Sequence, residues 1–195
     1  GVTLTNVSDR RTGFQIAGPY ARDVLAATTR VPVDLAFMDV RRKTVGKVDC
    51  SVQRVSYTGD LRYEIYCDQM SQRALWLTLW AAGAAHDMVP FGMRAMMSLR
   101  LDRFFGSWMA EFSPDYTPAE TGLDRFIHWG KSTDFIGRQA AEAERQSGPK
   151  RKLVQLEVDA LDADIHGYEP IWLGGVVVGF CTSGGFAHHS GASHA

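Results

Sequence analysis

The fold is decided by residues 45–67, which read Val45-Gly-Lys-Val-Asp-Cys-Ser-Val-Gln-Arg-Val-Ser-Tyr-Thr-Gly-Asp-Leu-Arg-Tyr-Glu-Ile-Tyr-Cys67. The first part is rich in β-branched residues, and its C-terminal end alternates apolar and polar side chains with the period of two that is typical of a strand. Thr58-Gly59-Asp60 combines residue types that favour turns, and the alternation then resumes. The pattern predicts a β-hairpin with strands at Val45–Tyr57 and Leu61–Cys67.

Helical patterns surround this hairpin. Apolar residues cover all sides of Met70–Ala85, which is typical of a buried helix, and Pro19 favours a short helix at Tyr20–Ala27. Two more helices and two more strands are expected at Met93–Phe104, Phe135–Ala143, Val2–Val7 and Phe14–Ala17. This order of elements indicates an α+β fold, an antiparallel sheet with helices on one face.

The texture changes to all-β after a linker at Ser147-Gly-Pro-Lys150. One strand is expected at Lys152–Val158, and a hairpin joins Pro170–Leu173 to Val176–Thr182 through two glycines. Three strands form a small sheet with open edges. We therefore expect a first domain at residues 1–147 and a small, incomplete β-barrel-like C-terminal domain at residues 148–195.

Composition excludes several classes of partner. The 195 residues carry 21 basic and 22 acidic side chains, so the chain offers no excess charge for nucleic acid or an anionic membrane. The longest apolar stretch is too short to span a bilayer. The three cysteines form no C-x-x-C pair, which predicts free, buried thiols and a cytoplasmic location: Cys50, Cys67 and Cys181. Four histidines match no metal-ligand spacing, so no metal site is predicted: His166, His188, His189 and His194.

Six segments, in this order and across nearly the whole chain, carry a resemblance. They are Arg54–Tyr66, Gly92–Leu101, Asp115–Leu123, Asp134–Ala140, Glu169–Trp172 and Thr182–Gly185. Each is a weak signal alone, but together they resemble the glycine-cleavage T-protein (aminomethyltransferase) family. Within it they are most similar to the C-terminal, folate-binding part of dimethylglycine and sarcosine dehydrogenases.

The resemblance implies an activity and a set of ligand-binding residues. A one-carbon unit would leave an amine and be captured by tetrahydrofolate as the 5,10-methylene form. The pterin ring carries N–H donors along its edge, and a carboxylate can accept two of them at once. By position in the family motif, Glu64 is expected to bind the pterin, with Tyr57 lining the same pocket, Arg94 contacting folate and Trp108 forming a wall.

Simpler roles stay open for the same residues. Tyr57 could be an aromatic that packs across the hairpin. Arg94 could pair with Asp102 or with Glu64 at the surface. Trp108 could belong to an ordinary hydrophobic core rather than to a pocket wall.

The chain also departs from the family pattern. Arg62 replaces the usual glycine of the hairpin, and Ser107-Trp-Met109 stands where Trp-Gly is typical. The family's catalytic aspartate belongs to a segment upstream of the matched region, so no catalytic residue is assigned and no turnover is expected from this chain alone. There is no Rossmann fingerprint, so a flavin-containing amine dehydrogenase subunit is the expected partner.

Three functions therefore stand side by side. The first is a tetrahydrofolate-dependent one-carbon transfer module, as a partial copy of the family's domain. The second is a non-catalytic folate-binding module like the T-protein-like factors of iron–sulfur cluster assembly, although the cysteine of their motif is missing from Phe135–Gln139. The third is an inactive fragment.

Overall fold

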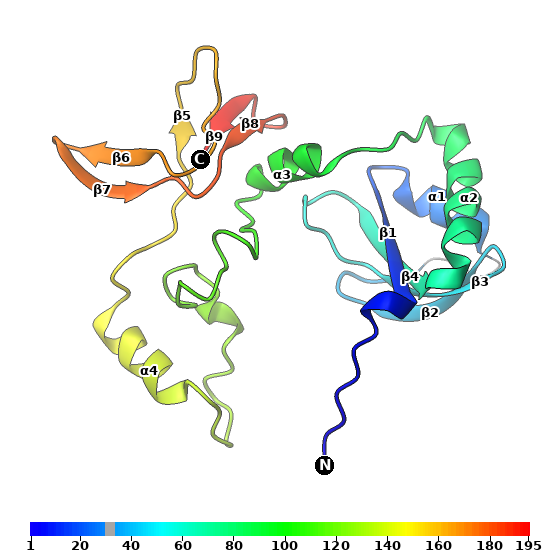
Figure 1. Ribbon diagram of the computed structural model, residues 1–195, viewed down its shortest axis with the longest axis horizontal. Coiled ribbons are helices and arrows are strands. Elements are labelled where there is room, and N and C mark those ends of the chain that lie inside the picture. Colours follow the sequence, from blue (N-terminus) through cyan, green and yellow to red (C-terminus); the bar gives the residue numbers. More distant parts are fainter. Residues whose placement is uncertain (30–33) are drawn as a thin grey trace. The chain divides into compact units, whose positions relative to one another are not determined.

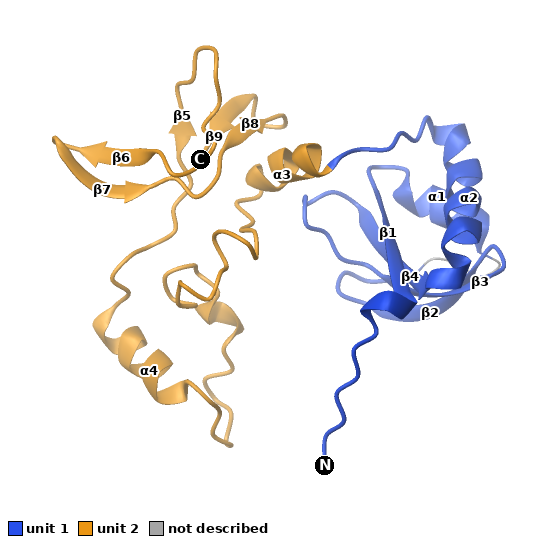
Figure 2. Ribbon diagram, viewed as in Figure 1, with its two compact units in different colours: residues 1–92 blue, residues 93–195 orange. Residues whose placement is uncertain are grey.

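The computed structural model describes residues 1–29 and 34–195 (Figure 1). The chain forms two compact units, Gly1–Gly92 and Met93–Ala195 (Figure 2). The boundary between these units, at Gly92, lies before the change to an all-β sequence pattern that follows Ser147. The domain boundary predicted at residue 147 stays a prediction.

The first unit is a four-stranded antiparallel sheet with two helices and the strand order β1-β4-β3-β2 (Figure 1). Its strands are β1 (Arg11–Ala17), β2 (Val40–Val45), β3 (Val48–Gln53) and β4 (Arg62–Asp68). Its α-helices and single 3-10 turns are α1 (Ala21–Thr28), α2 (Gln72–Gly83), η1 (Ser8–Arg10), η2 (Gln69–Ser71) and η3 (Ala84–His86). The architecture confirms the expected α+β class.

Strand β4 divides its side chains between the two faces of the sheet. Tyr63, Ile65 and Cys67 are fully buried in one core cluster with Leu25 of α1 and Leu75 of α2. Because successive side chains of a strand point to opposite faces, the residues between them are directed away from the helices. The helices thus cover one face, and the other face is left for polar side chains.

The predicted hairpin is confirmed, with shorter strands than expected. Strands β3 and β4 pair in antiparallel register, with Gln53 opposite Glu64 and Ser51 opposite Tyr66. Strand β3 ends at Gln53 instead of Tyr57, and the backbone of Arg54 still bonds to Met38 and Asp39, just before β2. Residues 54–61 form the connection between the two strands.

Three expectations for the first unit are wrong. Residues 2–7 form no strand, and Val2 and Leu4 are almost fully exposed because this stretch pairs with no neighbouring strand among the described residues. Strand β2 was not expected, since its Val-Arg-Arg-Lys-Thr-Val sequence is charged, as suits an exposed edge. Helix α2 buries only one side, and Trp76 and Trp80 are exposed.

The second unit combines two helices with two small sheets. Its elements are α3 (Met93–Leu101), η4 (Asp124–Phe126), α4 (Arg138–Ser147), β5 (Glu157–Val158), β6 (Pro170–Leu173), β7 (Val176–Phe180), β8 (Gly185–Ala187) and β9 (Ala192–His194). The sheets have the orders β5-β9-β8 and β6-β7, and within the described part of the chain they do not close into a barrel. The incomplete β-barrel-like character is thereby confirmed.

Details of the second unit refine the expected strands. The β6–β7 hairpin turns through Gly174 and Gly175, which both have positive φ, as a two-residue hairpin turn requires. The strand expected from Lys152 pairs only over β5, because the backbone N–H of Leu153 donates instead to the carbonyl of Glu120. In residues 1–29 and 34–195, no helix is long and apolar enough to cross a membrane.

Candidate functional site

Glu64 lies on the face of the sheet that the helices leave uncovered. Arg62 Nη2 donates to Glu64 Oε1 at 2.8 Å, and the Tyr66 hydroxyl donates to Glu64 Oε2 at 2.8 Å. All three side chains come from β4 at a spacing of two, which puts them on one face. The Glu64 side chain is 19% exposed, whereas that of Arg62 is 3% exposed. The carboxylate is therefore held at both oxygens but is still accessible.

A glycine on the neighbouring strand makes room for this arrangement. Gly13 of β1 lies opposite Tyr66 in the register. A Cβ atom added at Gly13 would lie 2.6 Å from the Tyr66 ring, which is closer than real carbon contacts come. The Tyr66 ring therefore lies across the backbone of Gly13, and its hydroxyl reaches Glu64 from there. Gln15 and Gln53 flank Glu64 on the two adjacent strands.

Burial and charge set the protonation states of this cluster. Burial lowers the pKa of the Arg62 guanidinium, and the negative charge of Glu64 opposes that shift. An arginine still keeps its proton in a protein. Burial and the hydrogen bond to Glu64 raise the pKa of the Tyr66 phenol above its ordinary value of 10.0. At neutral pH the phenol is therefore a donor, and Glu64 accepts from two fixed groups.

Tyr57 lies in the connection between β3 and β4 and is half-buried. Its phenol is close enough to Arg62 for its charge to raise the pKa of the guanidinium. Arg62 thus lies near Tyr57 and is bonded to Glu64. That Tyr57 and Glu64 line one pocket stays a prediction.

The other two expected ligand-binding residues belong to the second unit. Arg94 is exposed in the first turn of α3, and Asp102, a partner that we considered for it, accepts hydrogen bonds from Ser190. Trp108 is 71% exposed, and its ring meets that of Phe112 edge-on, with 5.6 Å between the ring centroids. Its exposure argues against a place in a hydrophobic core.

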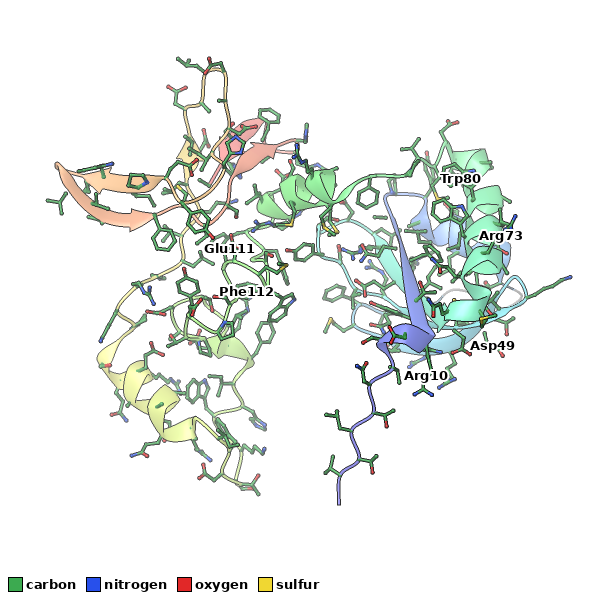
Figure 3. The ribbon with its side chains drawn as sticks, in the orientation of Figure 1. Arg10, Asp49, Arg73, Trp80, Glu111 and Phe112 are labelled. Atoms are coloured by element: carbon green, nitrogen blue, oxygen red, sulfur yellow. The ribbon has the colours of Figure 1, made fainter. Side chains whose placement is uncertain are left out.

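A second buried charge pair holds the second unit together. Arg100 Nη1 lies 3.2 Å from Glu111 Oε2, which also accepts from the backbone N–H of Ser107 at 2.7 Å (Figure 3). Glu111 Oε1 accepts from the hydroxyls of Thr182, at 2.8 Å, and Ser183. Burial alone would raise the pKa of the Glu111 carboxyl, but these donors outweigh it and hold the pKa below its ordinary value of 4.5. The site joins α3 to the chain before β8 and is structural.

Three of these residues, Tyr66, Arg62 and Glu111, were not predicted from the sequence to belong to a site. Tyr66 follows Glu64 by two positions, so the period of a strand was a usable signal for their common face. Arg62 was noticed only as a departure from the family pattern. Glu111 gave no signal, because its partners come from segments far away in the sequence. Among the described residues, no group of three or more His, Cys, Asp or Glu side chains is placed to hold a metal ion.

Comparison with family models gives matches over most of the chain. A model described as the GCVT N-terminal domain matches residues 1–131. A second, described as the glycine cleavage T-protein C-terminal barrel domain, matches residues 151–195.

Individual relatives match nearly all of this chain but only part of their own length. The chain is 35% identical to dimethylglycine dehydrogenase, mitochondrial, of Mus musculus, over 96% of the chain and 22% of that protein. It is 35% identical to an aminomethyltransferase of Moorella thermoacetica, over 95% of the chain and 50% of that protein. A crystal structure of glycine cleavage system aminomethyltransferase T from Bartonella henselae matches with a TM-score of 0.79 and 26% identity, over 94% of this chain and 50% of that one. The chain thus spans half the length of these aminomethyltransferases.

Proposed function

Because the chain belongs to the glycine cleavage T-protein family, we propose that it is the folate-binding part of a tetrahydrofolate-dependent one-carbon transfer module. The observation that carries the proposal is the Glu64 carboxylate, fixed at both oxygens on the open face of the sheet and still partly exposed. A carboxylate that is already fixed loses little conformational entropy when a ligand binds, so ordering it weakens the binding only slightly.

The donor set fits a pterin. An ionised carboxylate offers about four lone-pair positions on its two oxygens. Arg62 and Tyr66 use one position on each oxygen, and the remaining two can accept neighbouring N–H groups of the pterin edge. Glu64 would then set the orientation of the ring, and Arg62 and Tyr66 would hold Glu64. Tyr57 is a further proposed folate contact in the first unit, and the expected roles of Arg94 and Trp108, which belong to the second unit, stay predictions.

The module would work on a one-carbon unit released from an amine, which tetrahydrofolate captures as the 5,10-methylene form. In this proposal the chain's own residues bind and orient the folate. The aminomethyltransferase relatives support this reading, since 35% identity extends over almost the whole chain.

The test is calorimetric titration of the full chain with tetrahydrofolate under anaerobic conditions. Glu64→Ala should weaken binding by about 1.5–3 kcal/mol, the scale of hydrogen bonds to a charged group, which is roughly a 10- to 150-fold larger dissociation constant. Glu64→Gln keeps the size of the side chain and guards against misfolding caused by an unpaired Arg62.

Glu142→Ala is the matched control, because Glu142 also accepts from an arginine at 2.8 Å but lies on α4. Equal dissociation constants for the native chain and both Glu64 variants would contradict the proposal. Binding of tetrahydrofolate without formation of 5,10-methylenetetrahydrofolate when an amine-demethylating partner is supplied would favour the non-catalytic folate-binding module.

A flavin-containing amine dehydrogenase is the proposed partner. The support is the similarity to dimethylglycine dehydrogenase, which extends over 96% of this chain. Co-purification of the chain with such a dehydrogenase, and a faster capture of its one-carbon product, would test the pairing. We also propose a cytoplasmic location, for which the three free, buried cysteines are the support. The mouse relative is named as mitochondrial, so fractionation of cells is the deciding measurement.

A further inference from the structure

Strand β4 begins at Arg62, and two nitrogens of this buried side chain have no hydrogen-bond partner. Among the described residues, the buried side-chain atoms that lack a hydrogen-bond partner include Ser56 Oγ and both Nε and Nη1 of Arg62. Burying an N–H without an acceptor is unfavourable, and more so when the group is charged. Arg100 Nε in the second unit is another such atom, so an unpaired atom alone does not mark a ligand site. The unpaired atoms of Arg62 are candidates because this side chain also bonds the partly exposed carboxylate of Glu64.

Arg62 is enclosed, and its guanidinium is fixed at one end. Its side chain is 3% exposed, and Nη2 is occupied by Glu64. The guanidinium is a planar, rigid fork, so fixing Nη2 also fixes the directions of the other N–H groups. Nε and Nη1 therefore lie in the same fixed plane as Nη2, which bonds a carboxylate that still has acceptor capacity.

We propose that Arg62 is a specificity residue, which donates a hydrogen bond to the C4 carbonyl oxygen of the pterin while Glu64 accepts the neighbouring N–H groups. The inference rests on the proposed folate function. Along one edge, a pterin carries the C4 carbonyl, the N3–H and the 2-amino group, in the order acceptor, donor, donor. Arg62 and Glu64 offer the complementary order of donor, acceptor, acceptor.

Complementary rows of this kind discriminate strongly, because the wrong ligand leaves buried groups unpaired. A ligand with an amino group in place of the C4 oxygen would put a donor against the Arg62 donors. Such a ligand would also lack the proton on N3, so Glu64 would lose one of the N–H groups that it accepts. Only the first of these two losses depends on Arg62.

The experiment compares tetrahydrofolate with 4-amino-4-deoxytetrahydrofolate by anaerobic calorimetry on the full chain. The native chain should prefer tetrahydrofolate, and Arg62→Gly should reduce that preference by about tenfold or more, the scale of one hydrogen bond to a charged group. Arg62→Lys keeps the charge without the fork and should give an intermediate preference; it also carries the test if Arg62→Gly does not fold. Arg11→Gly is the control, because Arg11 lies on the adjacent strand in its own ion pair, 2.9 Å from Asp68.

The outcomes separate this inference from the proposed function. Binding of tetrahydrofolate that depends on Glu64, with the same preference in the native chain and in the Arg62 variants, would overturn the role of Arg62 and leave the folate site standing. No binding of tetrahydrofolate by the native chain would overturn both. A preference that falls in the Arg62 variants and not in Arg11→Gly supports the inference.

Discussion

In two arginine–glutamate pairs the arginine is buried, Arg62–Glu64 in the first unit and Arg100–Glu111 in the second, and the two pairs serve different roles. Glu111 is 4% exposed, accepts hydrogen bonds from Ser107, Thr182 and Ser183, and forms an ion pair with Arg100, so protein groups surround its carboxylate. Glu64 accepts from two groups and is 19% exposed, and its partner Arg62 has two nitrogens without a hydrogen-bond partner, Nε and Nη1, whereas Arg100 has one, Nε. The difference shows that a buried ion pair signals function only through the bonds that it leaves open.

The largest expected effect is a loss of stability when the charge of Glu111 is removed, because this breaks its pair with Arg100. Glu111→Gln leaves Arg100 buried without a counter-charge, and breaking such a pair costs about 3–5 kcal/mol. The free energy of unfolding, from urea titration followed by circular dichroism, measures it.

Glu142→Gln is the control for that measurement, because its i,i+4 pair with Arg138 is largely exposed and should contribute at most about 0.5 kcal/mol. If the two variants lose the same free energy of unfolding, the Arg100–Glu111 pair does not stabilise the second unit more than an exposed pair does.

Acid should weaken the same pair without a mutation. The folded-state pKa of Glu111 lies below its ordinary value of 4.5, so its contribution to stability is fully present above that value and is lost as the pH falls through the folded-state pKa. Urea titrations at a series of pH values below 6 should therefore show a decline in stability that is smaller in Glu111→Gln. Parallel declines in the two proteins would contradict the assignment.

Adding one carbon at Gly13 should disturb the open pair. In Gly13→Ala the new Cβ atom would lie 2.6 Å from the Tyr66 ring, and overpacking of this kind costs about 1–3 kcal/mol. The displaced ring would release Glu64, so tetrahydrofolate binding should weaken together with stability. A variant that binds as the native chain does would show that Tyr66 does not orient Glu64.

The smallest expected effect is that of a single hydroxyl. Tyr66→Phe removes one hydrogen bond to Glu64 and should cost about 0.5–1.5 kcal/mol of stability, and folate binding should weaken as well. Tyr63→Phe is the matched control on the opposite face, where the hydroxyl accepts from Arg22. Thermal unfolding and calorimetry distinguish the pair, because only Tyr66→Phe should change the dissociation constant.

The sequence predicted those parts of the molecule in which local pattern and burial agree. The β3–β4 hairpin and the β6–β7 hairpin follow from alternation and turn residues, whereas the role of Glu64, which comes from the family motif, stays a prediction. Residues 2–7 have the alternation of a strand but no partner among the described residues, and edge strand β2 has a partner but no apolar alternation. Whether each segment forms a strand depends on pairing with a segment elsewhere in the chain. The local sequence pattern contains no information about that pairing.

The same limit applies to the site. The bond between Tyr66 and Glu64 follows from a spacing of two, whereas the place of Tyr66 above Gly13 depends on the register between β1 and β4. The unpaired N–H groups of Arg62 depend on what encloses them, which only the three-dimensional structure reveals.

The strand order β1-β4-β3-β2 has a consequence for the time course of folding. Strands β2, β3 and β4 pair with sequence neighbours, so their contacts close short loops. Strand β1 pairs with β4 instead, and the Arg11–Asp68 contact joins residues 57 positions apart. Closing a longer loop costs more chain entropy, and non-local contacts form more slowly. The three-strand meander is therefore expected to assemble first and β1 to dock last, which would make Gly13 and Tyr66 meet only in the final step of folding.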